Sequence, residues 1–171
     1  MNVMIVEDQA VIRGLLESYF HNEDEYRIVA SIPGAKQAVD LCESIAVDLI
    51  LMDVQTAHNE NGLSAVRKIK ALRPDIKIIV VTSLIDRHVF EQAKAVGADS
   101  LWYKDASEDR LMSVVRQTME GKHIFPDAPP DAEIGAACSA DFTKTELKVL
   151  RHLLRGLSYT RIAKEMGIEA T

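Results

Sequence analysis

Short apolar runs alternate with stretches of helical periodicity along the first two thirds of the chain. Each run is too short for a helix and predicts a β-strand; the runs cover residues 3–6, 26–32, 48–53, 76–81 and 100–103. After each run, apolar residues recur at helical spacing, as Leu63, Val66 and Ile69 do at intervals of three, which predicts an amphipathic helix. Helical crossovers make successive strands parallel. The pattern therefore predicts an α/β fold with a doubly wound, five-stranded parallel sheet.

The alternation ends at Gly121. Residues 122–141 are rich in proline, alanine and aspartate, which is typical of a linker. Helical periodicity then returns, and the sequence from Thr143 to Glu146 predicts a capping box at the start of a helix. We predict a first domain over residues 1–121, this linker, and a small all-α domain over residues 142–171.

Composition places the chain among soluble globular proteins, because 47% of its 171 residues are hydrophobic and 27% are charged. No stretch approaches the roughly 20 apolar residues that a membrane span needs. Residues 1–6 lack the basic and long apolar segments of a signal peptide. The two cysteines, Cys42 and Cys138, are far apart and in no metal-binding spacing. We expect a cytoplasmic protein with reduced thiols and no membrane partner.

Charge is divided unevenly along the chain, although the net charge is −6. Residues 1–140 hold 14 basic and 22 acidic side chains, whereas residues 141–171 hold 6 basic and 4 acidic ones. The acidic first part suits cation binding and repels nucleic acid. The net positive charge of residues 141–171 allows that part to approach phosphates.

Acidic side chains follow two of the predicted strands. Glu7 and Asp8 follow the first strand, and Asp53 ends the third. In a sheet of order 2-1-3-4-5 these strands are neighbours, so the three carboxylates meet at the carboxyl edge of the sheet. Each pair repels by about 4 kcal/mol at 4 Å and an effective dielectric of 20. Protons or a divalent cation must relieve this repulsion, and oxygen ligands favour Mg²⁺ over Zn²⁺. Asp8 is also placed to cap the helix that follows.

Two further residues end strands at the same edge. Thr82 offers a hydroxyl donor after the fourth strand, and Lys104 offers an ammonium group after the fifth. These residues together can take up a phosphoryl group, because they gather a metal site, a nucleophilic carboxylate, a cation and a hydroxyl around one point.

This set of residues resembles the receiver domain of bacterial two-component response regulators. The end of the chain is similar to a LuxR-type helix-turn-helix, through Phe142-Thr143-Lys144-Thr145-Glu146, Gly156-Leu157-Ser158, Ile162-Ala163 and Gly167-Ile168. Together they resemble a regulator of the NarL/FixJ type over nearly all of the chain. The expected architecture is a flavodoxin-like receiver followed by an incomplete helix-turn-helix domain.

The resemblance implies that Asp53 accepts a phosphoryl group from a sensor histidine kinase. Glu7, Asp8 and the Gln55 carbonyl would help Asp53 to hold Mg²⁺. Lys104 would pair with the phosphoryl oxygens, and Thr82 would move to hydrogen-bond one of them. The chain would be a regulator and not an enzyme, apart from its own phosphorylation and dephosphorylation. It would form a homodimer when phosphorylated.

The family usually has an aromatic residue where this chain has Leu101, and its base-reading helix would follow Gly167-Ile168. That helix is missing from the sequence, so residues 1–171 are expected to bind DNA without sequence preference, whereas an intact protein would bind promoter DNA. Phosphate contacts are expected from Lys148, Arg151, Arg155, Arg161 and Lys164.

Three other functions fit parts of the sequence. A receiver that acts through protein contacts alone needs no DNA-binding helix. A phosphatase of the haloacid dehalogenase type also uses an aspartyl nucleophile, but it needs a second aspartate where this chain has Gln55. A nucleotide-binding Rossmann domain needs a glycine-rich turn after the first strand, where Glu7 and Asp8 would repel phosphates.

Overall fold

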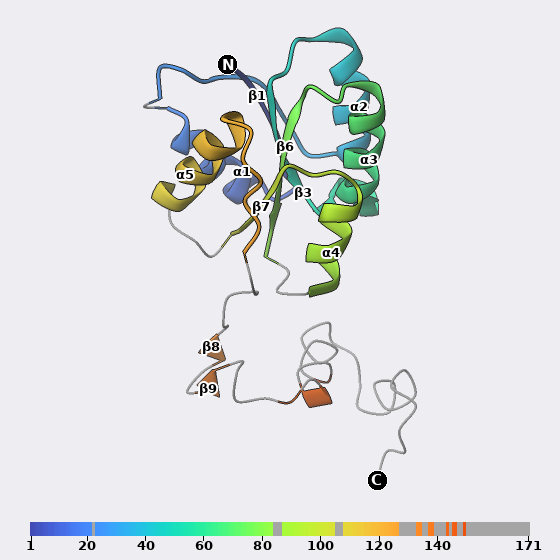
Figure 1. The fold of residues 1–171 in the computed structure, drawn as a ribbon, viewed down its shortest axis with the longest axis vertical. Helices are drawn as coiled ribbons and strands as arrows, with labels where there is room; N and C mark the ends of the chain where they lie inside the picture. Colours follow the sequence, from blue (N-terminus) through green and yellow to red (C-terminus); the bar gives the residue numbers. More distant parts are fainter. Residues whose placement is uncertain are drawn as a thin grey trace. The chain divides into compact units, whose positions relative to one another are not determined.

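The structure, a computed structural model, describes residues 1–21, 23–83, 87–104 and 108–126, and, nearer the end, residues 133–134, 137–138, 143, 145–146 and 149. It divides the chain into two compact units, Met1–Pro129 and Pro130–Thr171. Figure 1 traces both units along the sequence. The division falls inside the expected linker of residues 122–141.

The first unit contains a five-stranded parallel sheet of order β2-β1-β3-β6-β7. In chain order the strands are β1 (Asn2–Val6), β2 (Arg27–Ile32), β3 (Leu49–Asp53), β6 (Lys77–Thr82) and β7 (Ser100–Tyr103). Counted among these five strands, the order is 2-1-3-4-5. The predicted fold class and strand order are therefore confirmed.

Helices cover both faces of this sheet, as Figure 1 shows. One face carries α1 (Ala10–Tyr19) and α5 (Glu108–Met119). The other carries α2 (Ala35–Ser44), α3 (Gly62–Leu72) and α4 (Arg87–Ala95). The result is the doubly wound arrangement that parallel strands with helical crossovers require.

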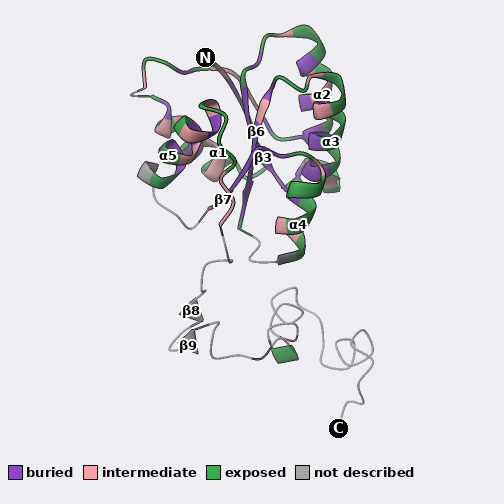
Figure 2. Ribbon diagram, viewed as in Figure 1, coloured by how far each residue is buried: buried purple, intermediate pink, exposed green. Residues whose placement is uncertain are grey.

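The core consists of two apolar clusters, one on each face of the sheet, and β3 contributes to both. Leu49 and Leu51 pack in the cluster under α1 and α5, whereas Ile50 and Met52 pack in the cluster under the other three helices. All five residues of β3 are buried, as Figure 2 shows for the central strands. The apolar run therefore forms a strand buried on both faces, as predicted.

Residues 55–61, which follow β3 after Val54, form a small antiparallel hairpin. Its strands are β4 (Gln55–Thr56) and β5 (Glu60–Asn61), joined by a 3₁₀ turn, η1 (Ala57–Asn59). His58 and Asn59 have φ of 62° and 56°, in the left-handed region that tight turns use. The buried Thr56 hydroxyl holds the hairpin together, because it accepts from the Ala35 amide at 3.1 Å and donates to the Glu60 carbonyl at 3.2 Å.

The chain stays on the sheet after α5 ends. The Leu101 amide donates to the Ile124 carbonyl at 2.9 Å, and the Ile124 amide donates to Ser100 Oγ at 3.0 Å. Residues 122–126 therefore lie along the outer edge of β7 within the first unit.

The second unit is described in part. Two short strands, β8 (Glu133–Ile134) and β9 (Ala137–Cys138), pair antiparallel within the expected linker. Farther on, the Thr143 amide donates to Glu146 Oε2 at 2.7 Å and the Glu146 amide donates to Thr143 Oγ1 at 3.3 Å, which forms the predicted capping box. The expected DNA contacts lie outside the described residues: Lys148, Arg151, Arg155, Arg161 and Lys164. Among the helices that the structure describes, none is long and apolar enough to cross a membrane.

Candidate phosphoacceptor site

Strand ends bring the predicted site residues together at the carboxyl edge of the sheet. Glu7 and Asp8 follow β1, and Asp53 is the last residue of the adjacent strand β3. Thr82 ends β6 and is the register partner of Tyr103, which immediately precedes Lys104. The three acidic side chains each offer an oxygen within 4.8 Å of the others. The convergence predicted from the sequence is therefore present in the fold.

The three carboxylates differ in their exposure to solvent. Glu7 and Asp53 are buried, with 0% and 5% of their surface exposed, whereas Asp8 is exposed. A cation at this point would thus have two oxygens from the protein interior and one from the surface. Hard oxygen donors of this kind, with solvent on one side, fit Mg²⁺ with retained water ligands.

Lys104 is the counter-ion of the two buried carboxylates. Its ammonium lies 2.5 Å from Glu7 Oε2 and 3.0 Å from Asp53 Oδ2, and 9% of its side chain is exposed. The Lys104 backbone amide donates to the Thr82 carbonyl at 3.0 Å, which fixes the start of the lysine side chain next to β6. The Thr82 side chain is buried at the same edge.

One lysine does not compensate for two buried carboxylates. Burial raises the pKa of Glu7, and the Asp53 charge adds to this, although the Lys104 hydrogen bond opposes it. Burial likewise raises the pKa of Asp53, against the attraction of Lys104 and hydrogen bonds from the Val54 and Gln55 amides. Both pKa values therefore lie above the ordinary range, which indicates that the site favours additional positive charge.

Asp8 does not cap α1. The N-cap residue is Gln9, whose side chain makes no capping bond, and the Gln9 amide donates to Glu7 Oε1 at 3.0 Å. The buried Glu7 carboxylate therefore accepts a hydrogen bond from the N-cap residue itself. The exposed Asp8 carboxylate stays available at the rim of the site.

Gly62 is a site residue that the sequence analysis missed. A Cβ atom at this position would lie 1.8 Å from the Asp53 carbonyl oxygen and 2.9 Å from the Asp53 carbonyl carbon. The Gly62 amide also donates to the Val54 carbonyl at 2.9 Å. Only a residue without a side chain lets α3 begin directly against the backbone of the candidate nucleophile. A glycine at the junction of a polar segment and a helix was the available signal.

Arg13 is a second residue that the sequence analysis missed. From α1, its Nη1 donates to the Glu7 carbonyl at 2.7 Å and to the Asp8 carbonyl at 3.4 Å. The guanidinium therefore holds the backbone that carries two of the three carboxylates and adds positive charge nearby. An arginine in the first turns of a helix after an acidic pair was the signal. Gln55 is exposed at the start of β4, and the part of its carbonyl as a metal ligand stays a prediction.

Comparison with known proteins identifies the first unit. The family profile described as the response regulator receiver domain matches residues 3–116. Transcriptional regulatory protein DesR of Bacillus subtilis is 28% identical over 170 residues, which cover 99% of this chain and 83% of that protein. Response regulator protein VraR of Staphylococcus epidermidis is 27% identical over 173 residues, which cover 98% of this chain and 82% of that protein.

Solved structures share the fold. A two-component response regulator of the LuxR family from Aurantimonas sp. has a TM-score of 0.68 at 20% identity, covering 72% of this chain and 87% of that one. RcsB from Salmonella typhimurium has a TM-score of 0.67 at 16% identity, covering 99% of this chain and 84% of that one. These findings agree with the resemblance to NarL/FixJ-type regulators. The chain belongs to the response regulator receiver domain family.

Proposed function

We propose that this protein is a phosphorylation-dependent regulator in which Asp53 accepts a phosphoryl group from a sensor histidine kinase. The observation that carries the proposal is the bridging position of Lys104, between Asp53 at 3.0 Å and Glu7 at 2.5 Å, beside the exposed Asp8. A buried carboxylate next to an ammonium group and a hard-cation site has the parts that phosphoryl transfer needs.

In the proposed reaction, an Asp53 carboxylate oxygen attacks phosphorus, and the bond from phosphorus to the donor breaks. The electron pair of that bond leaves with the donor group. Lys104 is placed to exchange its pairing with Asp53 for the new phosphoryl oxygens, and the Thr82 hydroxyl to hydrogen-bond one of them. Glu7, Asp8, Asp53 and the Gln55 carbonyl would hold Mg²⁺, which supplies charge neutralisation at the transferring group when it is bound.

The proposed output is DNA binding by a domain to which residues 142–171 contribute, in a cytoplasmic protein that dimerises when phosphorylated. The net positive charge of residues 141–171 and the capping box at Thr143 support a small basic helical domain. The relative DesR is named a transcriptional regulatory protein, and an RcsB structure is described as two dimers bound to DNA. Phosphate contacts are proposed for Lys148, Arg151, Arg155, Arg161 and Lys164.

Incubation with Mg²⁺ and acetyl phosphate tests the phosphoacceptor directly. We expect the intact mass to increase by one phosphoryl group, measured under conditions that preserve acyl phosphates. The increase should disappear in Asp53→Ala and weaken in Asp8→Asn, because the latter loses an anionic metal ligand. Asp75→Asn is the matched control. It removes an exposed carboxylate that precedes β6 and is not part of the acidic cluster, so this variant should be phosphorylated normally.

A mass increase that survives in Asp53→Ala would assign the phosphoacceptor to another residue. Sustained turnover of a phosphate ester would favour the phosphatase alternative. If phosphorylation changes binding to a partner protein and leaves DNA binding unchanged, the function is that of a receiver acting through protein contacts.

A further inference from the structure

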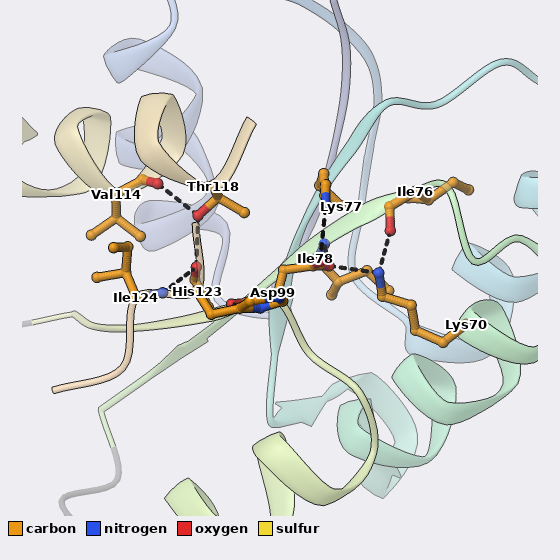
Figure 3. A network of polar contacts seen from close by, with 10 residues as sticks. Lys70, Ile76, Lys77, Ile78, Asp99, Val114, Thr118, His123 and Ile124 are labelled. Atoms are coloured by element: carbon orange, nitrogen blue, oxygen red, sulfur yellow. Dashed lines mark hydrogen bonds and ion pairs between the residues drawn. The ribbon is translucent and has the colours of Figure 1, made fainter. Parts of the chain in front are cut away.

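The segment after α5 is tied to the outer edge of the sheet by backbone and side-chain contacts. The Leu101 amide donates to the Ile124 carbonyl at 2.9 Å, and the Ile124 amide donates to Ser100 Oγ at 3.0 Å. The neighbouring His123 Nδ1 lies 2.9 Å from the Asp99 carbonyl, so this nitrogen donates. Figure 3 shows His123 and Ile124 beside Asp99. We call residues 122–126 the clasp.

An aromatic contact joins the clasp to α4. The rings of Phe125 and Phe90 meet edge to face, with centroids 5.7 Å apart and an interplanar angle of 83°. Lys94 Nζ lies 4.3 Å from the Phe90 centroid and 5.0 Å from the Phe125 centroid. The ammonium thus bridges the two rings by cation–π attraction, and both kinds of contact stabilise the packing of the clasp on α4.

The helix that the clasp holds is weakly anchored elsewhere. Among the described side chains of α4, only Ala93 is buried, whereas α3 has five buried residues. Val89, Phe90 and Val96 are half-buried. Since few buried apolar contacts mean a low free energy of local displacement, α4 is a helix that a local force moves readily. The Phe125 contact is therefore a sizeable part of what fixes it.

The same helix is connected to the phosphoacceptor site. Thr82 ends β6, and α4, the next helix, begins at Arg87. Thr82 is also the register partner of Tyr103 in β7. Tyr103 and Ala93 are buried in one apolar cluster, and Phe125 packs against that cluster. Thr82 is thus connected to α4 through its backbone pairing with Tyr103 and through the cluster that Tyr103 shares with Ala93.

We propose that the clasp is a phosphorylation-sensitive latch, closed on α4 when Asp53 is unmodified and released when Asp53 carries a phosphoryl group. This inference rests on the proposed function, because the driving force is the movement of Thr82 toward the phosphoryl oxygens. Displacement of α4 separates Phe90 from Phe125 and frees the start of the segment that leads to the second unit. By thermodynamic linkage, breaking the clasp in turn favours the phosphorylated conformation.

Amide hydrogen exchange of the full chain, followed by NMR, tests the latch. The probe is Mg²⁺ with beryllium trifluoride, which mimics a bound phosphoryl group. We expect the Leu101 and Ile124 amides to exchange at least about 5-fold faster when the probe is bound, the lower end of common coupling energies. The Ile50 and Leu51 amides in the buried centre of the sheet should not change.

The reverse coupling is measured by the affinity for the same probe. Phe125→Leu, and separately Lys94→Met, should bind beryllium trifluoride about 5-fold more tightly because each weakens the closed clasp. Phe20→Leu is the matched control, since Phe20 meets Tyr26 edge to face at 5.6 Å in the cluster on the other face of the sheet. Its affinity for the probe should equal that of the wild type.

The outcomes separate the two proposals. Loss of all probe binding in Asp53→Ala, with normal binding in the wild type, supports the phosphoacceptor. Probe binding that leaves the Leu101 and Ile124 amides and the affinity of Phe125→Leu unchanged overturns the latch and leaves the phosphoacceptor standing. Absence of Asp53-dependent probe binding overturns the proposed function itself.

Discussion

At the residue scale, the site combines two buried carboxylates with one ammonium group. Removing two carboxylates from water carries a desolvation penalty that a single ion-pair partner offsets only partly. The raised pKa values of Glu7 and Asp53 follow from this, with burial as the main cause in both. The site thus lowers the stability of the metal-free protein and favours cation binding at the same point.

Asp53→Asn should stabilise the metal-free protein at neutral and higher pH. Because the pKa of Asp53 is raised in the folded state, the folded chain binds its proton more tightly than the unfolded chain. Protonated Asp53 therefore contributes to the stability of the folded state in acid, and this contribution is lost as pH rises through the folded-state pKa of Asp53. We expect the variant to melt about 2–4 °C higher than the wild type at pH 8, because a gain of about 1 kcal/mol in the free energy of unfolding raises the melting temperature by that amount at this chain length.

This gain should vanish in acid, below the ordinary aspartate pKa, and thermal melts across the pH range measure it. Added Mg²⁺ should stabilise the wild type more than the variant, because the variant lacks one anionic ligand. A metal-free Asp53→Asn protein that melts below the wild type at pH 8 would show that Lys104 more than compensates for the buried charge.

Gly62→Ala should impair both stability and phosphorylation. The new Cβ would overlap the Asp53 carbonyl oxygen at 1.8 Å, so the backbone of the phosphoacceptor or the start of α3 must shift. Overpacking of this kind destabilises by about 1–3 kcal/mol. We expect urea unfolding to show that loss and acetyl phosphate to label the variant more slowly.

Gly14→Ala is the matched control for that substitution. Gly14 lies within α1, and a Cβ there would meet nothing within 4 Å. Alanine in a helix interior is favoured over glycine by roughly 0.5–1 kcal/mol, so this variant should be slightly more stable and should be phosphorylated normally. Equal behaviour of the two variants would contradict the role of Gly62.

At the element scale, one buried aspartate ties three elements together at the edge of the sheet opposite the candidate phosphoacceptor site. Asp99, just before β7, lies 2.6 Å from Lys70 Nζ of α3 and 3.2 Å from Lys77 Nζ of β6, and its Oδ2 accepts from the Ile78 amide at 2.9 Å. Figure 3 shows this arrangement. Burial acts to raise the pKa of Asp99, but the Lys70 and Ile78 hydrogen bonds outweigh it, and the pKa lies below the ordinary value.

Asp99→Ala should therefore destabilise the protein by about 3–5 kcal/mol, the usual effect of removing one partner of a buried ion pair. Because the folded-state pKa of Asp99 is lowered, its stabilisation is present above the unfolded-state pKa and is lost as pH falls through the folded-state value. Urea unfolding at neutral pH and in acid measures both effects. Asp75→Ala, at an exposed ion pair with Arg73, is the control and should leave stability nearly unchanged.

The predictable elements are those whose formation depends on a local pattern. The apolar runs located all five strands of the sheet, and the Thr143–Glu146 spacing located a helix start, because both are governed by periodicity and capping. The hairpin over residues 55–61 and the clasp were missed, since they depend on long-range partners such as Ala35 and Ser100. The site shows the same division. Asp53 and Lys104 could be predicted because they lie at strand ends. Gly62 and Arg13 could not, because their roles depend on contacts with the backbone of residues distant in the local sequence pattern.

At the scale of the whole molecule, the proposed function requires that a charge added at one edge of the sheet changes the association of complete chains. A phosphoryl group adds roughly −1.5 to −2 charges beside Lys104 and Thr82. Moving a two-state population from 1:99 to 99:1 takes about 5.5 kcal/mol. Two contacts to a charged group, at about 1.5–3 kcal/mol each, come close to that requirement. Both contacts are therefore needed for a complete switch.

Lys104→Ala and Thr82→Val should separate phosphorylation from the change in oligomeric state. Each variant keeps Asp53 and the acidic metal ligands, so acetyl phosphate with Mg²⁺ should still raise its mass by one phosphoryl group. Each lacks one of the two phosphoryl contacts, so the monomer-to-dimer shift expected on phosphorylation should shrink at least tenfold in equilibrium constant, about 1.4 kcal/mol. Sedimentation of phosphorylated samples measures this, with Lys68→Ala on the exposed side of α3 as the equal-charge control. Variants that dimerise as fully as this control would show that Lys104 and Thr82 do not transmit the phosphoryl charge.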